Sequence, residues 1–329
     1  MKPFTYQRAG DMSSAVATVA ERPEASFLAG GTNLVDLMKM EVLTPELLVD
    51  VRHLVSHQIQ DLPGGGLRIG AGVSNSELAA DRRVRRGYPM LSQAILAGAS
   101  YQLRNLATVG GNFLQRTRCM YFRDVTMPCN KREPGTGCSA RDGQQRDLAI
   151  LGASKLCVAT HPSDMAVAMA ALDAVVHTVG PAGERTVPVN RLYRSPSDGP
   201  ERDTVLDRGE LITAVEIPAA PIAARSRYRK VRDRASYAFA LVSVAAAIEV
   251  GDGAVSGVRI ALGGVAHRPW RATTAERELF GMPATEESFR AAAEAELAAA
   301  WPLPGNAFKV PLARNTVVGM LRALTEEAR

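Results

Sequence analysis

Phe27-Leu-Ala-Gly-Gly-Thr-Asn-Leu34 is the stretch of this chain that most constrains its fold. A short predicted strand runs into two adjacent glycines, and a helix is predicted behind them at residues 34–40. Two glycines without Cβ atoms let successive backbone N–H groups converge on one anion. Thr32 and Asn33 add side-chain hydrogen bonds, and the start of the helix adds partial positive charge. The stretch therefore suits a pyrophosphate group, with a plain turn as the alternative.

A second stretch, Arg104-Asn-Leu-Ala-Thr-Val-Gly-Gly-Asn112, repeats this chemistry. It too has two adjacent glycines flanked by Thr and Asn. Two such loops in one domain can hold the two ends of a long dinucleotide, and the pair is more specific than either loop alone. The chain contains no Gly-x-Gly-x-x-Gly and no Walker A pattern, which disfavours a nicotinamide-type Rossmann domain.

Length, charge and hydropathy exclude several classes of protein. At 329 residues the chain is long for a single hydrophobic core, so two or three domains are expected. Its net charge of +5 is small, and the densest basic run, residues 81–86, lacks the interleaved aromatic side chains of a nucleic-acid-binding stripe. The longest apolar run covers residues 238–248, well short of the roughly 20 residues that cross a membrane. The N-terminus lacks the apolar segment of a secretory signal peptide.

Short strands and helices follow one another irregularly along the chain. Strands are predicted at residues 26–29, 46–51, 67–71, 211–217, 228–231, 239–249 and 257–262. Helices are predicted at residues 34–40, 77–81, 89–100, 165–176, 273–280, 286–299 and 310–328. Residues 115–154 show no regular pattern, and such a length inside a compact domain usually has a function. Because the elements lack a steady βαβ order, the sequence favours an α+β fold over a doubly wound sheet.

All the cysteines of the chain fall in one segment. They are Cys119, Cys129, Cys138 and Cys157. Four thiolates are the normal ligand set of a [4Fe–4S] cluster. Basic residues nearby would offset an anionic centre; they are Arg116, Arg118, Lys131 and Arg132. The spacing matches neither paired Cys-x2-Cys motifs nor the ferredoxin run, so the residues alone leave an iron–sulfur cluster, a structural zinc ion and two disulfides open.

The two diglycine stretches resemble those of the FAD-binding subunits of the xanthine dehydrogenase and molybdenum hydroxylase family. In that family they read Ala-Gly-Gly-Thr-(Asp/Asn)-Leu, as at residues 29–34, and Ala-Thr-(Ile/Val)-Gly-Gly-Asn, as at residues 107–112. The resemblance covers almost the whole chain. It implies an α+β fold: a PCMH-like FAD-binding domain with subdomains at 1–57 and 58–220, then a small C-terminal α/β domain of the molybdenum hydroxylase flavoprotein type at 225–329.

Residues 113–158 look like an insertion in this family pattern. Typical members continue directly into Ala-Ser-Pro-x-x-Asp, and a similar segment appears here only at residues 159–164. The inserted residues, with Arg116-Thr-Arg-Cys-Met-Tyr-Phe122 and Pro128-Cys-Asn-Lys-Arg132, resemble one branch of the family, the FAD and [4Fe–4S] subunits of bacterial periplasmic aldehyde oxidoreductases. The resemblance implies that the four cysteines bind a [4Fe–4S] cluster.

The family pattern also implies which residues bind FAD. From the two diglycine stretches these are Leu28, Ala29, Gly30, Gly31, Thr32, Asn33, Leu34, Ala107, Thr108, Gly110, Gly111 and Asn112. Asp164, Ile212 and Lys230 match positions near the flavin. Asp164 can instead be a helix cap and Lys230 a surface lysine. His161 lies beside Asp164 and can contribute a hydrogen bond.

The resemblance implies electron transfer within a heterotrimeric aldehyde oxidoreductase. A large partner subunit would oxidise the aldehyde at a molybdenum cofactor, and a small partner would carry [2Fe–2S] clusters. FAD on this chain, which needs no catalytic residue of its own, would then reduce an external acceptor. Co-export to the periplasm with a signal-bearing partner is expected, with the cytoplasm as the alternative. Two other functions stay open: a free-standing FAD oxidoreductase and a zinc-stabilised interaction module without catalysis.

Overall fold

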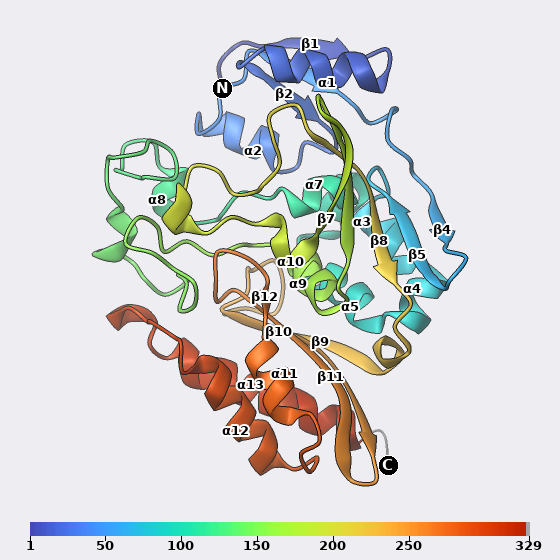
Figure 1. Cartoon of the computed structure of the whole chain (residues 1–329). Coiled ribbons are helices and arrows are strands. Elements are labelled where there is room, and N and C mark those ends of the chain that lie inside the picture. The colour runs from blue at the N-terminus through green and yellow to red at the C-terminus, as the bar shows by residue number, and fades with distance from the viewer. Residues whose placement is uncertain (327–329) are drawn as a thin grey trace.

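The computed structural model describes residues 1–326 and contains three β-sheets in sequence order (Figure 1). The first sheet lies at one end of the molecule and the third at the other, with the middle sheet between them. The green segment around α8 projects from one side of the middle region. Strands and helices are mixed throughout, which confirms the predicted α+β class.

The first sheet is parallel, with the strand order β1-β3-β2. Its strands are β1 (Thr5–Arg8), β2 (Ala25–Leu28) and β3 (Leu47–Asp50). The helices between them are α1 (Met12–Glu21) and α2 (Leu34–Lys39). Strand β3 is buried along its whole length, as its run of apolar residues predicts for the centre of a parallel sheet. Asp11 caps α1 by accepting the N–H of Ser14 at 2.8 Å.

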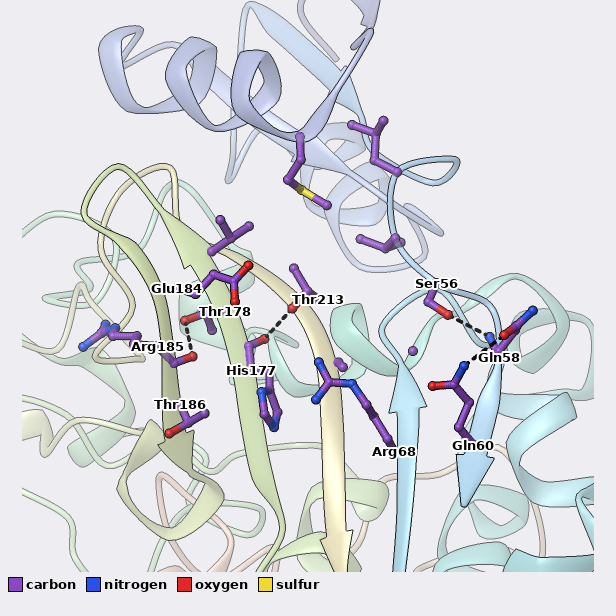
Figure 2. A pocket seen from close by; sticks show the side chains of 16 residues that line it. Ser56, Gln58, Gln60, Arg68, His177, Thr178, Glu184, Arg185, Thr186 and Thr213 are labelled. Carbon is purple, nitrogen blue, oxygen red and sulfur yellow. Dashed lines mark hydrogen bonds between the residues drawn. The ribbon is translucent and has the colours of Figure 1, made fainter. Parts of the chain in front are cut away.

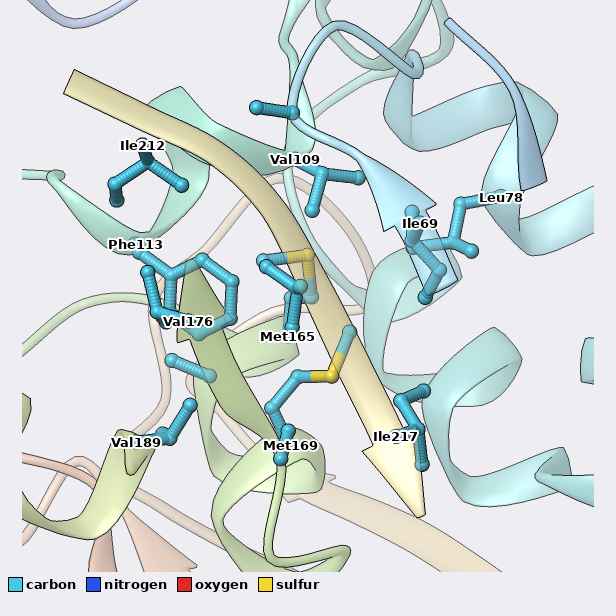
Figure 3. Packing of buried hydrophobic residues seen from close by; sticks show 14 of the residues in the cluster. Ile69, Leu78, Val109, Phe113, Met165, Met169, Val176, Val189, Ile212 and Ile217 are labelled. Carbon is cyan, nitrogen blue, oxygen red and sulfur yellow. The ribbon is translucent and has the colours of Figure 1, made fainter. Parts of the chain in front are cut away.

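The middle sheet is antiparallel, with the strand order β4-β5-β8-β6-β7. Its strands are β4 (Ile59–Asp61), β5 (Gly66–Gly70), β6 (Val175–Gly180), β7 (Gly183–Pro188) and β8 (Leu211–Pro218). Alternate side chains, such as Ile69 and Ile217, face a core that they share with Phe113 (Figure 3). The intervening side chains face outward, where Arg68 pairs with Glu216 at 2.6 Å.

Seven helices belong to this part of the chain, and six of them contribute buried residues to the core that the sheet faces. The seven are α3 (Asn75–Ala80), α4 (Arg82–Gly87), α5 (Pro89–Ala97), α6 (Tyr101–Leu106), α7 (Val109–Phe113), α9 (Asp164–Ala171) and α10 (Val189–Leu192). Every residue of α9 is buried. The predicted helix at 165–176 is too long. Asp173, with a φ of +53°, ends the helical path, and the β-branched Val175 and Val176 begin β6 instead.

Residues 114–163 connect α7 to α9 with little regular structure, as predicted. Their regular elements are α8 (Met120–Arg123) and a 3₁₀ turn (Ser139–Arg141). An antiparallel bridge joins Cys129 to Cys138. Two small hydrophobic clusters support the segment, one around Phe122 against α2 and one around Leu148. The segment therefore has its own small cores in place of a long helix or strand.

The third sheet is antiparallel, with the strand order β12-β11-β10-β9. Its strands are β9 (Ser226–Val231), β10 (Val242–Gly251), β11 (Ala254–Gly263) and β12 (Trp270–Arg271), and its helices are α11 (Thr273–Leu279), α12 (Glu286–Leu297) and α13 (Lys309–Glu326). Alternate residues of β10 belong to different cores: Ala245 to that of the middle sheet and Val244 to that of the C-terminal helices. The predicted strand at 239–249 begins later, because Phe239 lies exposed beside Arg118 outside the sheet.

Three 3₁₀ turns complete the elements. They are Pro196–Asp198, Pro221–Arg225 and Pro304–Asn306. The predicted helix at 310–328 is α13, which the structure describes as far as Glu326. Residues 327 and 328 of that prediction lie outside the described part. None of the helices in residues 1–326 combines the length and the apolar character needed to cross a membrane.

Candidate cofactor site

The first diglycine turn lies directly against the second stretch. A Cβ atom on Gly30 would lie 2.1 Å from the carbonyl oxygen of Leu106, so only glycine permits this contact. Asn33 Oδ1 accepts the N–H of Arg116 at 3.0 Å, just beyond α7. Leu28, Ala29, Thr32 and Leu34 surround the turn and are half-buried. The fold thus brings together two stretches that are far apart in sequence.

The second diglycine pair is the first turn of a helix, where the sequence predicts a loop. Thr108 Oγ1 caps α7 by accepting the N–H of Gly111 at 3.2 Å. Gly110 packs closely on β5: its N–H donates to Ala71 O at 3.0 Å, and a Cβ there would lie 3.0 Å from that of Ala71. The Ala107 carbonyl accepts the N–H of Asn75 at 2.9 Å. These glycines are therefore needed for close packing at the start of a short helix.

The two stretches differ in their free backbone donors. In the second, the N–H groups of residues 109–112 already donate to acceptors within the protein. In the first, the N–H groups of residues 30–33 have no acceptor within residues 1–326. The first turn is consequently the one whose N–H groups can bind an anion.

A chain of hydrogen bonds leads from the second stretch to α9 and β9. Ser163 Oγ donates to Asn112 Oδ1 and accepts the N–H of Ala166, which caps α9. The next residue, Asp164, accepts Lys230 Nζ on Oδ2 at 2.7 Å. Tyr228 Oη donates to the other carboxylate oxygen of Asp164. Asp164 and Lys230, both predicted near the flavin, are therefore partners in one buried ion pair.

Tyr228 is a member of this network that the sequence interpretation missed. Burial and the adjacent Asp164 carboxylate raise the pKa of Tyr228 well above its usual value, so the hydroxyl remains a donor. Tyr228 and Lys230 stand two residues apart on β9, and side chains at this spacing share one face of a strand. That spacing could have identified Tyr228 from the sequence once Lys230 was proposed.

A cavity of about 580 Å³ opens beside Asp164. Its lining includes His161 and Ser163 before α9, Arg118 and Cys119 from the segment after α7, and Phe239 before β10. This volume is typical of a site for a cofactor-sized group. The cavity therefore joins the predicted flavin residue Asp164 to one of the four cysteines.

Ile212 lies outside the lining of the 580 Å³ cavity. It is 2% exposed in β8 and faces the core beside Phe113 and Val176 (Figure 3). Its assignment as an FAD contact stays a prediction.

A second cavity, of about 540 Å³, lies on the outer face of the middle sheet (Figure 2). Arg68, His177 and Thr213 contribute to its lining, and none of the residues predicted to bind FAD does so. Arg68 and His177 both contact Glu216, at 2.6 and 3.2 Å. Arg185, which also lines this cavity, pairs with Glu210 at 2.6 Å, so both of its arginines already have acidic partners, and the 580 Å³ cavity is the better candidate for the cofactor.

The cysteines lie near one another as free thiols. Cys119 contributes to the hydrophobic cluster that contains Cys129 and to the one that contains Cys138, so it connects the two. Burial raises the pKa of Cys157 to about 12, although Lys131 opposes the shift. Burial also raises the pKa of Cys119, and the neighbouring thiols add to the effect. Four thiols from this one segment match the donor set of an iron–sulfur cluster.

All four cysteines are free thiols, so no disulfide links them in this structure. Within residues 1–326, no group of three or more His, Cys, Asp or Glu side chains, the cysteines included, is arranged to hold a metal ion. The iron–sulfur cluster and the zinc ion therefore both stay predictions.

The basic residues around the cysteines have partners of their own. Arg118 and Arg123 pair with Asp36 at 2.6 and 2.8 Å. Lys131 and Arg116 both pair with Asp203. Burial of Asp203 opposes its ionisation, but these two cations outweigh that effect and lower its pKa. Arg132 donates to the carbonyls of residues 121, 122 and 127. The cations predicted to face an anionic centre therefore also tie the cysteine segment to its surroundings.

Comparison with known proteins gives a consistent result over the whole chain. A family model described as FAD binding domain in molybdopterin dehydrogenase matches residues 2–220. A second, described as CO dehydrogenase flavoprotein C-terminal domain, matches residues 226–324. The chain is 51% identical over 329 residues to the aldehyde oxidoreductase FAD-binding subunit PaoB of Escherichia coli K12, with both chains fully covered.

More distant relatives also match over most of this chain. The chain is 26% identical over 278 residues to the glyceraldehyde dehydrogenase medium chain of Sulfolobus acidocaldarius, covering 84% of this chain and 81% of that protein. It superposes on a solved structure of carbon monoxide dehydrogenase from Hydrogenophaga pseudoflava with a TM-score of 0.76 and 26% identity, covering 99% of this chain and 98% of the other.

Proposed function

Since this chain belongs to the FAD-binding subunits of the molybdenum hydroxylase family, we propose that it is the FAD-binding subunit of a molybdenum-dependent aldehyde oxidoreductase. The observation that carries the proposal is the 51% identity to the E. coli aldehyde oxidoreductase subunit, which extends over the complete chain and includes the cysteine segment. The aldehyde is oxidised on a large partner subunit that holds the molybdenum cofactor. A small partner with [2Fe–2S] clusters passes the electrons on to this chain.

Two features of the site support the binding of FAD. The free N–H groups of residues 30–33 bind the pyrophosphate, and the cavity beside Asp164 holds the flavin ring system. When bound, FAD supplies two-electron redox chemistry, which none of the side chains here provides. Lys230 places a cation next to the site, and its bond to Asp164 fixes both side chains. The other residues predicted from the two stretches shape the turn and α7 around the cofactor.

The four cysteines hold a [4Fe–4S] cluster in this proposal. The four free thiols, all in one segment and two of them buried, support it. Cys119 also lines the cavity beside Asp164, which supports a direct electron path between cluster and flavin. A structural zinc ion and two disulfides are the alternatives that the tests below distinguish.

The proposed assembly and cellular location of the protein rest on the same family resemblance. The chain works in a heterotrimer, delivers electrons to an external acceptor and reaches the periplasm by co-export with a signal-bearing partner. We assign residues 1–57 and 58–220 to the two FAD-binding subdomains and 225–329 to the C-terminal domain. The family models, which end at 220 and begin again at 226, support the second of these boundaries.

Gel filtration of the natively expressed protein, with aldehyde-oxidising activity measured in every fraction, tests the assembly. We expect activity, molybdenum and this chain to elute together, at a mass well above 35.1 kDa. A flavin-containing single chain with its own oxidase activity would identify a free-standing oxidoreductase instead. A colourless chain that contains zinc would identify an interaction module.

A further inference from the structure

Cys129 and Cys138 face each other across an antiparallel β-bridge in the green segment around α8 (Figure 1). Backbone hydrogen bonds flank this bridge on both sides. The N–H of Asn130 donates to Gly137 O at 2.7 Å. The N–H of Ser139 donates to the carbonyl of the residue before Cys129 at 3.3 Å. The two cysteines are therefore a non-hydrogen-bonded pair, and side chains directly opposite each other in such a pair lie on the same face.

The backbone at this pair has the separation that a disulfide spans. Opposite residues of a non-hydrogen-bonded pair have Cα atoms about 4.5 Å apart, and disulfides join Cα atoms that are about 4.4–6.8 Å apart. Within residues 1–326, no other bridge or strand pairing joins two of the four cysteines. Both residues are free thiols here, Cys129 buried and Cys138 half-buried. The backbone therefore permits a disulfide between them without a change of fold.

Asn130 holds the turn between the two cysteines in this shape. Its Oδ1 accepts the N–H groups of Gly135 at 3.1 Å and Gly137 at 2.8 Å. Its Nδ2 donates to the carbonyl of Leu156 at 3.0 Å, next to Cys157. Gly135 and Gly137 have φ values of +90° and +102°, which glycine adopts without strain. Hydrogen bonds of the protein itself therefore keep the cysteine pair aligned.

We propose that Cys129 and Cys138 are a redox-sensitive pair, which forms a disulfide when the chain without a metal centre meets oxidised glutathione. The half-buried Cys138 attacks one sulfur of the glutathione disulfide, forms a mixed disulfide and releases one glutathione thiolate. Cys129 then attacks the sulfur of Cys138, which forms the protein disulfide and releases the second glutathione thiolate. The two thiolates take up the two protons of the cysteines, so two cysteines are oxidised and one glutathione disulfide is reduced.

In the proposed function, this pair sets an order of assembly. Cys129 and Cys138 are two of the four proposed cluster ligands, and a sulfur in a disulfide is no longer a thiolate that can bind a metal. The disulfide and a cluster on the same four cysteines therefore exclude each other. This consequence rests on the proposed cluster: iron has to enter the chain before the chain reaches an oxidising compartment.

Disulfide mapping of the full-length wild-type chain tests the pair. The chain is treated with a chelator under reducing conditions and transferred to oxidised glutathione, and the remaining thiols are blocked before digestion. Trypsin then leaves each cysteine on a separate peptide, because it cleaves after Arg118, Arg123, Lys131, Arg132, Arg141, Lys155 and Arg185. We expect the thiol count to fall from four to two per chain, with residues 124–131 linked to residues 133–141.

The same oxidation in urea is the matched control. In the unfolded chain the spacing along the sequence decides which cysteines meet. Cys119 and Cys129 are ten residues apart, and Cys129 and Cys138 are nine, so both links should form in similar amounts. The folded chain should form the link between Cys129 and Cys138 almost alone. Four remaining thiols in the folded chain, or the same mixture of links as in urea, would overturn the inference.

An iron measurement separates this inference from the proposed cluster. Iron and sulfide are offered to the oxidised chain before and after reduction with dithiothreitol, and the bound iron is counted. We expect uptake only after reduction. A chain that takes up no iron in either state would refute the cluster and leave the mapped disulfide standing. Equal uptake in both states would overturn the mutual exclusion of disulfide and cluster.

Discussion

Lys230 Nζ donates to Asp164 Oδ2 at 2.7 Å, and both side chains are buried. The two residues belong to different parts of the chain, since Asp164 falls in the family match at 2–220 and Lys230 in the match at 226–324. Tyr228 supports the same carboxylate from the same strand as Lys230. The wall of the cavity is therefore built jointly by two parts of the protein, and its shape depends on how they pack.

Replacing Lys230 by Met should destabilise the fold by about 3–5 kcal/mol, because it leaves the Asp164 carboxylate buried without its cation. Urea unfolding of the purified chain measures this loss. Arg68→Met is the matched control, because the Arg68–Glu216 pair is partly exposed and its loss should cost less than about 1 kcal/mol. Equal losses of unfolding free energy in the two variants would show that the buried Asp164–Lys230 pair stabilises the fold no more than a partly exposed pair does.

Gly30→Ala should disturb the first diglycine turn. The added Cβ would lie 2.1 Å from Leu106 O, which forces the two stretches apart. We expect a loss of about 1–3 kcal/mol in unfolding free energy and markedly lower FAD content after purification. Gly10→Ala is the control, since a Cβ at Gly10 meets nothing within 4 Å. Normal FAD content in Gly30→Ala would argue against pyrophosphate binding at this turn.

Local sequence chemistry predicts the first turn better than the second. The strand, the glycine pair and the helix at 34–40 follow from propensity and patterning, and the structure has β2 and α2 there within a residue. The second pair looks the same locally, yet it starts α7, because Thr108 caps the helix and Gly110 must approach Ala71. Ala71 is far away in sequence, so local pattern gives no signal of that contact.

The same limit applies to the cavity. Asp164 and Lys230 follow from the family resemblance, whereas the contact of Tyr228 with Asp164 depends on the packing of β9. The overlong helix prediction at 165–176 failed for a local reason, the left-handed conformation of Asp173. Contacts between distant segments are set by tertiary packing, and a single sequence does not show them.

Cys129→Ser should remove most of the iron from the purified protein and leave part of the flavin. The reason is that one of four thiolate ligands is lost while the cavity beside Asp164 stays intact. An iron assay and a visible spectrum measure the loss of iron and the flavin that is left, and a zinc assay on the same samples shows whether zinc is bound instead. Val125→Ala, at a half-exposed position in the same segment, is the control and should keep its iron.

Two results would contradict this ligand assignment. Unchanged iron in Cys129→Ser would exclude Cys129 as a ligand. If the denatured, non-reduced wild type has no titratable thiols, the cysteines form two disulfides. Zinc in stoichiometric amount would favour a structural zinc ion.

Acidification should lower the stability of the fold by protonating Glu210. Burial alone would raise the pKa of this carboxyl, but hydrogen bonds from Arg185, Thr178 and the N–H of Asp207 outweigh burial and lower the pKa to about 2. The folded pKa lies below the usual 4.5, so the stabilisation is complete above that pH and is lost as the pH falls towards 2. The unfolding free energy that is lost in this way is on the order of 2–3 kcal/mol.

Urea unfolding between pH 7 and pH 3 compares the wild type with Glu210→Gln. The variant should be less stable at pH 7 and lose less stability on acidification. Glu249→Gln is the control, because Glu249 is an exposed residue of β10. A Glu210→Gln curve parallel to that of the wild type would show that this carboxyl does not contribute to the acid sensitivity.

The most direct measurement is the identity and amount of flavin bound to the purified chain, obtained by acid release and chromatography beside the visible spectrum. We predict one FAD per chain, and that FAD content falls together in Gly30→Ala and Lys230→Met but not in Gly10→Ala. A wild-type protein that contains no flavin, and that takes up none on incubation with FAD, would contradict the central claim.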